Sequence, residues 1–168
     1  MLEFKVHDGE REVVLQFEHS LLSLSKWESK HLKPFMSNAM KKPSEMIEYF
    51  EDMIVTPDVD RNLVYALDPE QLDALATYIN ASKTASSVPK DQKPQFSQET
   101  ITSELIYYWM TAMKINWEAQ TWHLSRLMIL IEITNYKMQP EKKRSVREVY
   151  ADWREANERQ KKMFNTSG

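Results

Sequence analysis

The sequence of 168 residues contains no cysteine and only two glycines, and these absences exclude several kinds of chemistry. Without cysteine the chain can form neither disulfide bonds nor a thiolate active site, and zinc loses its commonest structural ligand. A phosphate-binding loop brings backbone close to the phosphate, which normally takes several glycines. Gly9 and Gly168 lie far apart in the sequence, so neither a P-loop nor a dinucleotide fingerprint can be built.

Long apolar runs and an excess of positive charge are also absent. No apolar run reaches the ~18 residues that a membrane-spanning helix needs, so we expect no membrane contact. The first ten residues, MLEFKVHDGE, lack the basic-then-apolar pattern of a secretory signal. The formal net charge of −3 argues against a general nucleic-acid binder.

The four histidines do not form a metal-binding pattern. Glu28 and His31 make one Glu-x-x-His pair, whereas a di-iron bundle site needs two such pairs and two more glutamates. His123 follows Trp122 in an apolar stretch, where a general base or a ligand is one interpretation. A buried histidine bonded to a neighbouring carbonyl or carboxylate is the favoured one. We therefore expect no enzyme activity, no cofactor and no metal site.

Residues 101–135 hold three of the five tryptophans and the densest run of large apolar side chains. Their spacings of three and four predict two helices. A short break at residues 114–116 should join the helices as an antiparallel pair. We expect four of their residues in the core: Trp109, Trp122, Leu127 and Ile131.

Residues 2–17 predict a β-hairpin, because Asp8-Gly9 is a strong two-residue turn signal between alternating apolar residues. With that turn, Lys5 lies opposite Glu12 as an oppositely charged pair. One face of the hairpin is then apolar and consists of Leu2, Phe4, Val6, Val13, Leu15 and Phe17. A two-stranded ribbon is marginally stable alone, so this face must cover helices or meet another chain.

Apolar stripes and capping residues predict the remaining helical segments. Ser20 and Asp68 are expected N-caps, and Pro43 and Pro69 stand at first-turn positions. The predicted segments are residues 20–33, 43–55, 62–66, 69–81 and 145–164. The fold class expected is mainly α, a helical bundle with an N-terminal β-hairpin packed on it.

Composition predicts two parts of unequal size. Residues 1–139 should form a single helical domain, with the polar stretch 82–98 as a mobile loop. Residues 140–168 should form a basic C-terminal helix or tail. Residues 44–80 carry nine acidic groups against one arginine, and residues 141–162 carry eight basic groups against five acidic ones. Such asymmetry steers a partner, pairs two segments of one chain, or simply marks solvated faces.

The end of the last helix is a candidate partner-binding segment. Its apolar stripe stops at Trp153, and basic residues follow. The candidates are Arg154, Arg159, Lys161 and Lys162. They could dock on an acidic surface of a partner or of another subunit, including the 44–80 segment of a neighbour. The alternative is a frayed, solvated end.

Three longer stretches carry a resemblance to a known family. They are LQFEHSLLSLSKWESKH (15–31), ITSELIYYWM (101–110) and WHLSRLMILI (122–131), and the basic PEKKRSVREV segment after them also fits. In this order they resemble small proteins of bacteriophages with long non-contractile tails, described as tail assembly chaperones or as tail-region proteins without an assigned role. Ser125 stands where the family pattern has asparagine.

The resemblance implies a non-enzymatic role in the host cell cytoplasm. Such chaperones bind the helical tape-measure protein and recruit tail-tube subunits, through helix-in-groove contacts. The expected partners are therefore phage tail proteins, with no nucleic acid and no membrane, and a homo-oligomer is left open. Two other functions stay open: a structural virion protein at the head–tail junction or tail, and a phage enzyme or host-takeover factor with an atypical site.

Overall fold

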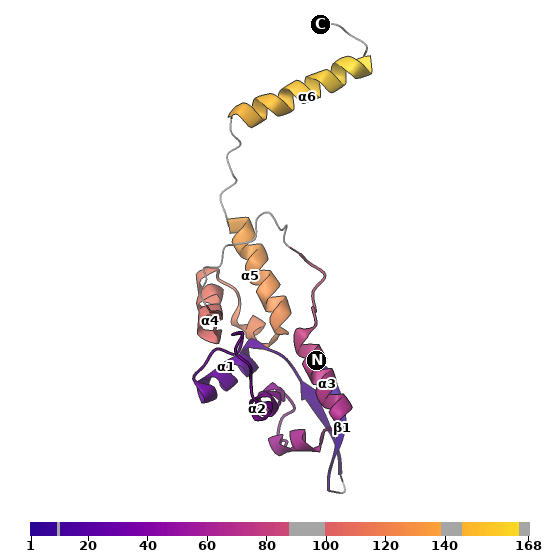
Figure 1. The fold of residues 1–168 in the computed structure, drawn as a ribbon, viewed down its shortest axis with the longest axis vertical. Coiled ribbons are helices and arrows are strands. Elements are labelled where there is room, and N and C mark those ends of the chain that lie inside the picture. The colour runs from indigo at the N-terminus through magenta and orange to yellow at the C-terminus, as the bar shows by residue number, and fades with distance from the viewer. Residues whose placement is uncertain (10, 88–99, 139–145, 165–168) are drawn as a thin grey trace. The chain divides into compact units, whose positions relative to one another are not determined.

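The computed structural model describes residues 1–9, 11–87, 100–138 and 146–164, and the chain divides into two compact units. The first unit is Met1–Met138 and the second is Gln139–Gly168. The first unit is mainly helical with one N-terminal β-hairpin, as the sequence predicts (Figure 1). The division falls one residue before the predicted domain end at residue 139.

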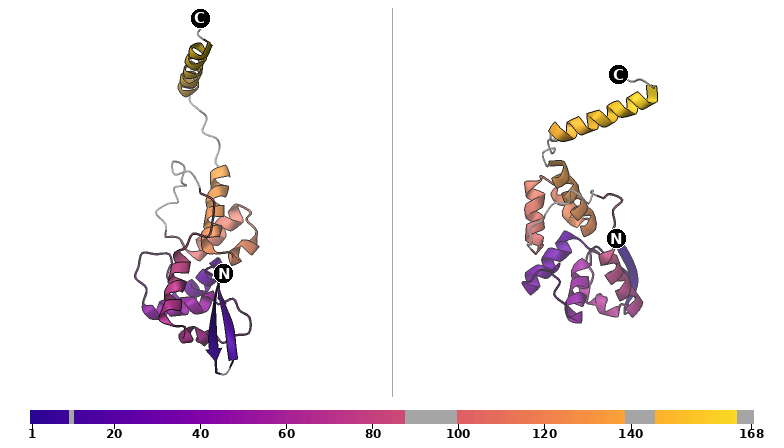
Figure 2. Two further views of the ribbon diagram at one scale, coloured as in Figure 1. Left: turned by 90° about the vertical axis from the view of Figure 1, so that its right-hand side faces the viewer. Right: turned by 45° about the horizontal axis from the view of Figure 1, so that its top comes forward.

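The hairpin consists of β1 (Leu2–Asp8) and β2 (Arg11–Phe17), which run side by side in the left view of Figure 2. The predicted turn at Asp8-Gly9 is wrong by one residue, because Asp8 pairs with Arg11 and Phe4 with Leu15. The turn therefore begins at Gly9, whose φ of 64° suits glycine.

The observed register matches each residue of the apolar face with another across the strands, which the predicted register did not. The apolar face is nevertheless the predicted one, since a shift by two residues keeps every side chain on its side. Lys5 and Glu12 form an ion pair of 2.7 Å, but along a diagonal, because Lys5 lies opposite Val14.

Both strands join the hairpin to the helices: β1 packs on η1 and α3, and the end of β2 is hydrogen-bonded to the chain at the end of α2. The amide of Glu18 donates to the carbonyl of Met53, and the amide of Val55 donates to the carbonyl of Gln16, both at 2.9 Å. The chain that leaves α2 thus covers the outer edge of β2, and Phe17 is fully buried. An unpaired strand edge invites association with other chains, so this cover protects the hairpin.

The helices of the first half begin where their capping residues predict. They are α1 (Leu21–His31), α2 (Pro43–Met53), the 3₁₀ helix η1 (Arg61–Ala66) and α3 (Pro69–Asn80). The Ser20 hydroxyl accepts from the amide of Ser23, and the Asp68 carboxylate accepts from the amide of Gln71. Both caps satisfy helix amides that have no partner inside the helix.

The region 101–135 differs from its prediction. It forms α4 (Ser103–Ala112), the 3₁₀ helix η3 (Trp117–Thr121) and α5 (Leu124–Met138). The predicted direct connection is wrong, since residues 113–123, which include η3, separate the helices. Asn116 caps η3 by accepting from the amide of Glu118, so the chain starts a new short helix where the break was expected to end. α4 packs on α1.

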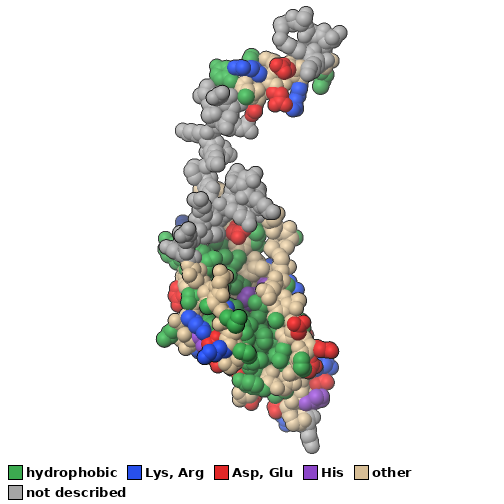
Figure 3. All heavy atoms as spheres, viewed as in Figure 1, with side chains coloured by type: hydrophobic (Ala, Val, Ile, Leu, Met, Phe, Trp, Pro, Cys, Tyr) green, Lys and Arg blue, Asp and Glu red, His purple; other side chains and the backbone are tan. Residues whose placement is uncertain are grey.

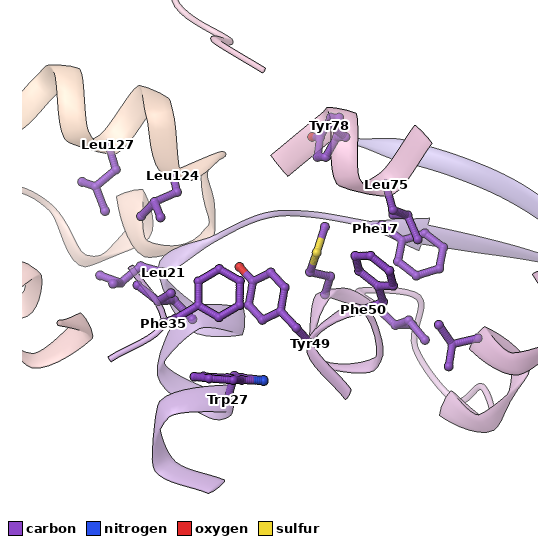
Figure 4. Close-up of a cluster of buried hydrophobic side chains, with 14 of the residues drawn as sticks. Phe17, Leu21, Trp27, Phe35, Tyr49, Phe50, Leu75, Tyr78, Leu124 and Leu127 are labelled. Carbon is purple, nitrogen blue, oxygen red and sulfur yellow. The ribbon is translucent and has the colours of Figure 1, made fainter. Parts of the chain in front are cut away.

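The core is centred on aromatic residues of the first half of the chain (Figure 4). The rings of Phe35 and Tyr49 stack with centroids 4.0 Å apart, and Trp27 meets Phe35 edge-on at 5.0 Å. Tyr49 and Trp27 are fully buried. The stretch 101–135 contributes to the same core through Ile106, Met110, Leu127 and Ile131, which have no exposed surface.

The four expected core residues divide into two pairs. Leu127 and Ile131 have no exposed surface. Trp109 and Trp122 are only partly buried and pack against the margin of the core, so their assignment as core is corrected. Trp122 keeps part of its ring at the surface, as large side chains often do. The guanidinium of Arg126 lies 5.1 Å from the centroid of this ring and can make a cation–π contact with it.

The second unit contains α6 (Val146–Phe164), within the range predicted for the last helix. The predicted loop 82–98 has no helix or strand in residues 82–87, and the rest of it lies outside the described residues. None of the described helices is both long enough and apolar enough to cross a membrane.

Candidate functional site

Buried polar side chains gather where the hairpin meets α2, α3 and α5. Nδ1 of His19 lies 2.5 Å from the Tyr49 hydroxyl, and the His19 ring meets the His123 ring edge-on at 5.3 Å. Nε2 of His123 lies 3.2 Å from the carbonyl oxygen of Tyr78, and Nδ1 lies 2.9 Å from the Ser125 hydroxyl. These partners fit a neutral His123 that donates from Nε2 and accepts at Nδ1.

Burial keeps both rings neutral at ordinary pH. It lowers the pKa of His19 to about 4, with His123 adding to the effect, and it also lowers the pKa of His123. The interpretation of His123 as a buried histidine bonded to a carbonyl is confirmed. Ser125, the residue that departs from the family pattern, both contacts this ring and accepts from the amide of Lys83 at 3.0 Å.

The same cluster also includes an ion pair with the amino group of Met1. The Tyr78 hydroxyl donates to the Glu18 carboxylate at 2.8 Å, and that carboxylate lies 3.2 Å from the terminal ammonium of Met1. The amide of Leu124 donates to the carbonyl of His19 at 2.7 Å. These bonds join segments distant in sequence, so we assign the cluster to holding the fold together.

Glu28 and His31, the one Glu-x-x-His pair, do not share a site. The Glu28 carboxylate accepts from the amide of Phe35 at 2.8 Å and from the amide of Ser103 at 2.7 Å. Nε2 of His31 instead lies 2.9 Å from the Glu48 carboxylate. Among the described residues, no three His, Asp or Glu side chains are arranged to hold a metal ion.

Two of the nine acidic groups in the segment 44–80 pair with lysines of the same unit. Lys33 pairs with Glu45 at 2.6 Å, and Lys30 pairs with the buried Asp52 at 2.7 Å. Glu48 and Glu51 are partly buried, and the five exposed carboxylates define the acidic patch, which consists of Asp58, Asp60, Asp68, Glu70 and Asp73. In Figure 3, acidic side chains lie along the edge formed by α3 and the hairpin.

A shallow groove follows α3 beside this patch. It has a volume of about 500 Å³ and is lined by Asp73, Ala76, Thr77, Asn80 and Ala81. Its lining residues belong to α3 and to the residue that follows it, so the groove is open to solvent, and Asp73 places a negative charge at one end.

The second unit presents large apolar side chains to solvent. Tyr150 is 59% exposed, Trp153 is 63% exposed and Met163 is 76% exposed. Two successive positions on one helix face are thus occupied by aromatic residues that are not covered. Tyr and Trp are the residues that most often dominate binding at protein interfaces.

The predicted partner-binding residues do not all lie on one side of α6. Arg154 is exposed, and Arg159 is exposed and pairs with Glu155 one turn earlier. Lys161 and Lys162 fall within the bounds of α6, but their side chains lie outside the described residues.

The helical register adds a pattern that the sequence analysis missed. Arg147, Arg154 and Lys161 recur in the sequence at intervals of seven, and Arg154, whose side chain is the described one of the three, is exposed. Tyr150 lies four residues before Arg154, so these two exposed side chains share a face of α6. The signal was present in the heptad spacing of the three cations.

Comparisons with protein-family models, with curated proteins and with solved structures find no match to this chain.

Proposed function

We propose that the protein is a non-enzymatic phage tail assembly chaperone-like protein, which uses α6 to capture helical tail proteins in the host cell cytoplasm. The observation that carries the proposal is the exposure of Tyr150 and Trp153 on one amphipathic helix. The resemblance of residues 15–31, 101–110 and 122–131 to small tail-region phage proteins supports the same assignment.

The physical basis is the burial of exposed apolar area on binding. Each Å² of apolar surface removed from water contributes about 25 cal/mol, so two large aromatic side chains can supply several kcal/mol. A tape-measure protein offers long helices whose apolar faces need cover before the tail tube encloses them. An amphipathic helix with an aromatic stripe suits such a partner.

Co-purification from infected cells tests the proposal. Tagged protein should bring down the tape-measure protein, the tail-tube subunit or both, and Trp153→Ala should strongly reduce the yield of these partners. Trp117→Ala is the matched control, since Trp117 is a comparably exposed tryptophan of the first unit at 54%.

Two outcomes contradict the proposal. Equal recovery of tail proteins by the Trp153→Ala variant would remove α6 from the contact. Recovery of the chain as a stoichiometric component of finished particles would favour the structural virion protein, because assembly chaperones leave before the particle is complete.

A further inference from the structure

The hairpin has one covered edge and one open edge. The chain that follows α2 lies along the outer edge of β2, where the amide of Gln16 donates to the Thr56 hydroxyl at 2.8 Å. That hydroxyl in turn donates to the carbonyl of Val14 at 3.2 Å. Among the described residues, no hydrogen bond reaches the outer edge of β1. This edge is therefore free to accept a further strand.

The strand register shows which backbone groups lie on the open edge. Opposite residues of an antiparallel pair either bond to each other or both point their backbone groups away. Val14 and Gln16 point away from β1, because their backbone groups bond to the chain after α2. Their partners Lys5 and Glu3 therefore point their amides and carbonyls outward from β1, and so does His7, two residues after Lys5.

The space beside these groups is open. A hollow with a volume of about 400 Å³ lies against β1 and is lined by Glu3, Phe4, Lys5, Val14 and Gln71. The side chains of Glu3 and Lys5 are exposed, and that of Phe4 is only partly buried. A strand added at the usual spacing of about 4.8 Å would meet charged side chains on one face and apolar ones on the other.

We propose that the open edge of β1 pairs antiparallel with β1 of a second copy, about a two-fold axis at Phe4, so that the two hairpins form one continuous sheet. In this register Glu3 of each copy lies opposite Lys5 of the other. Both residues present outward backbone groups, so they form the hydrogen-bonded pairs of the new ladder. This contact goes beyond the proposed function, since α6 takes no part in it.

The charges of β1 select this register and a second copy as the occupant. An axis at Glu3 would place two glutamates opposite each other, and an axis at Lys5 would place two lysines opposite each other, and both arrangements are repulsive. An axis at Val6 places Lys5 opposite His7 and gives no pair of opposite charge. An axis at Phe4 gives an attractive Glu–Lys pair twice, because a two-fold axis repeats every contact.

The apolar face of the hairpin favours the same register. Phe4 meets Phe4 of the second copy at the axis, as a close pair without ladder hydrogen bonds. Leu2 of each copy lies opposite Val6 of the other, so the apolar faces of the two hairpins become continuous. Phe4 already packs against Phe17, with ring centroids 5.9 Å apart, and the dimer covers the part of Phe4 that one copy leaves exposed.

Sedimentation equilibrium of the purified full chain tests the proposal. We expect a reversible dimer whose dissociation constant rises with salt, because the Glu–Lys pairs are screened. Glu3→Lys and Lys5→Glu should each raise the dissociation constant by about tenfold or more, because each change makes both charge pairs repulsive. An equimolar mixture of these two variants should associate again, because the lysines of one variant then lie opposite the glutamates of the other.

Arg11→Glu is the matched control for Lys5→Glu. It makes the same change of charge at an exposed position of the same hairpin, but Arg11 belongs to β2. Its dissociation constant should stay close to that of the unchanged chain. Lys5→Glu also removes the ion pair with Glu12, whereas Glu3→Lys keeps it, so an effect shared by both variants does not come from that pair. Far-UV circular dichroism checks that each variant folds.

Three results would overturn the proposal. The first is a chain that remains monomeric up to concentrations on the order of 1 mM. The second is a dimer that Glu3→Lys leaves unchanged, and the third is a mixture of the two variants that associates no more strongly than either alone. Because Glu3→Lys leaves α6 unaltered, this variant should still recover tail proteins from infected cells, so failure of self-association is distinguishable from failure of the proposed function.

Discussion

At the scale of single residues, buried polar groups act as connectors between distant segments. The Glu28 carboxylate joins the amides of Phe35 and Ser103, and 75 positions separate Glu28 from Ser103. His19 and His123 connect the end of the hairpin to α2, α3 and α5 through Tyr49 and a backbone carbonyl. Burying such a group without a hydrogen-bond partner costs free energy, so a substitution that removes one partner destabilises the fold through the unpaired group that remains.

This arrangement predicts that stability falls with acidification. Burial lowers the pKa of His19 from its ordinary value of 6.5 to about 4, so between these pH values the unfolded chain binds more protons than the folded chain. Stability is therefore full above pH 6.5 and is lost as pH falls toward 4. The loss from His19 alone should be on the order of 2 kcal/mol between pH 7 and pH 5.

Urea unfolding at the two pH values measures this dependence. The groups that face the histidines are Tyr49, Tyr78, Glu18, Lys83 and the terminal ammonium. In this pH range the tyrosines stay neutral, because burial raises the pKa of Tyr49 and of Tyr78. The His19→Gln variant should reduce the slope. Equal stability at pH 7 and pH 5 would show that His19 is solvated or bonded as a cation.

At the scale of elements, local chemistry explains most of what could be predicted. Ser20, Asp68 and the first-turn prolines mark helix starts, and their effect needs no distant partner. The hairpin face also follows from alternation alone. The register of the hairpin did not follow from alternation, because two different turns that contain Gly9 give the same apolar face. The choice between them depends on which residues pair across the strands and on the hydrogen bonds between β2 and the chain after α2.

The same reasoning explains the errors in the region 101–135. Apolar density predicted core positions for Trp109 and Trp122, yet both lie at the margin of the core. Whether a large side chain lies inside the core or at its margin depends on how separate segments pack, as Trp27, Phe35 and Tyr49 do. The spacing of apolar residues along one helix carries no information on that packing. The heptad of cations on α6 was visible in the sequence and required only the helical register.

The end of α6 gives a prediction for truncation. Deleting residues 155–168 removes little apolar area, so the free energy of unfolding should change by less than about 1 kcal/mol. The deletion removes Arg159, Lys161 and Lys162 and should weaken partner binding most at low salt, where charge contacts are strongest.

Denaturant unfolding and binding at two salt concentrations check the truncation. Loss of cooperative folding would mean that Met163 and Phe164 stabilise the first unit. Unchanged binding at low salt would mean that this end of the helix has no role in recognition.

At the scale of the whole molecule, the two units have different tasks in this account. The Met1–Met138 unit contains the buried core and the polar connectors, and it supports an acidic, grooved surface. The Gln139–Gly168 unit contributes a helix with an uncovered aromatic stripe. A stable body with an appended adaptable helix suits a protein that holds partners only during assembly.

The central claim is that α6 is the element that engages a tail protein. Hydrogen exchange of the full chain, alone and with the purified tape-measure protein, tests it most directly, since a helix that becomes covered exchanges its amides more slowly. We predict slower exchange throughout Val146–Phe164 when the partner is present, with the slowing lost in the Trp153→Ala variant. Unchanged exchange in α6 together with slowing confined to Met1–Met138 would contradict the claim.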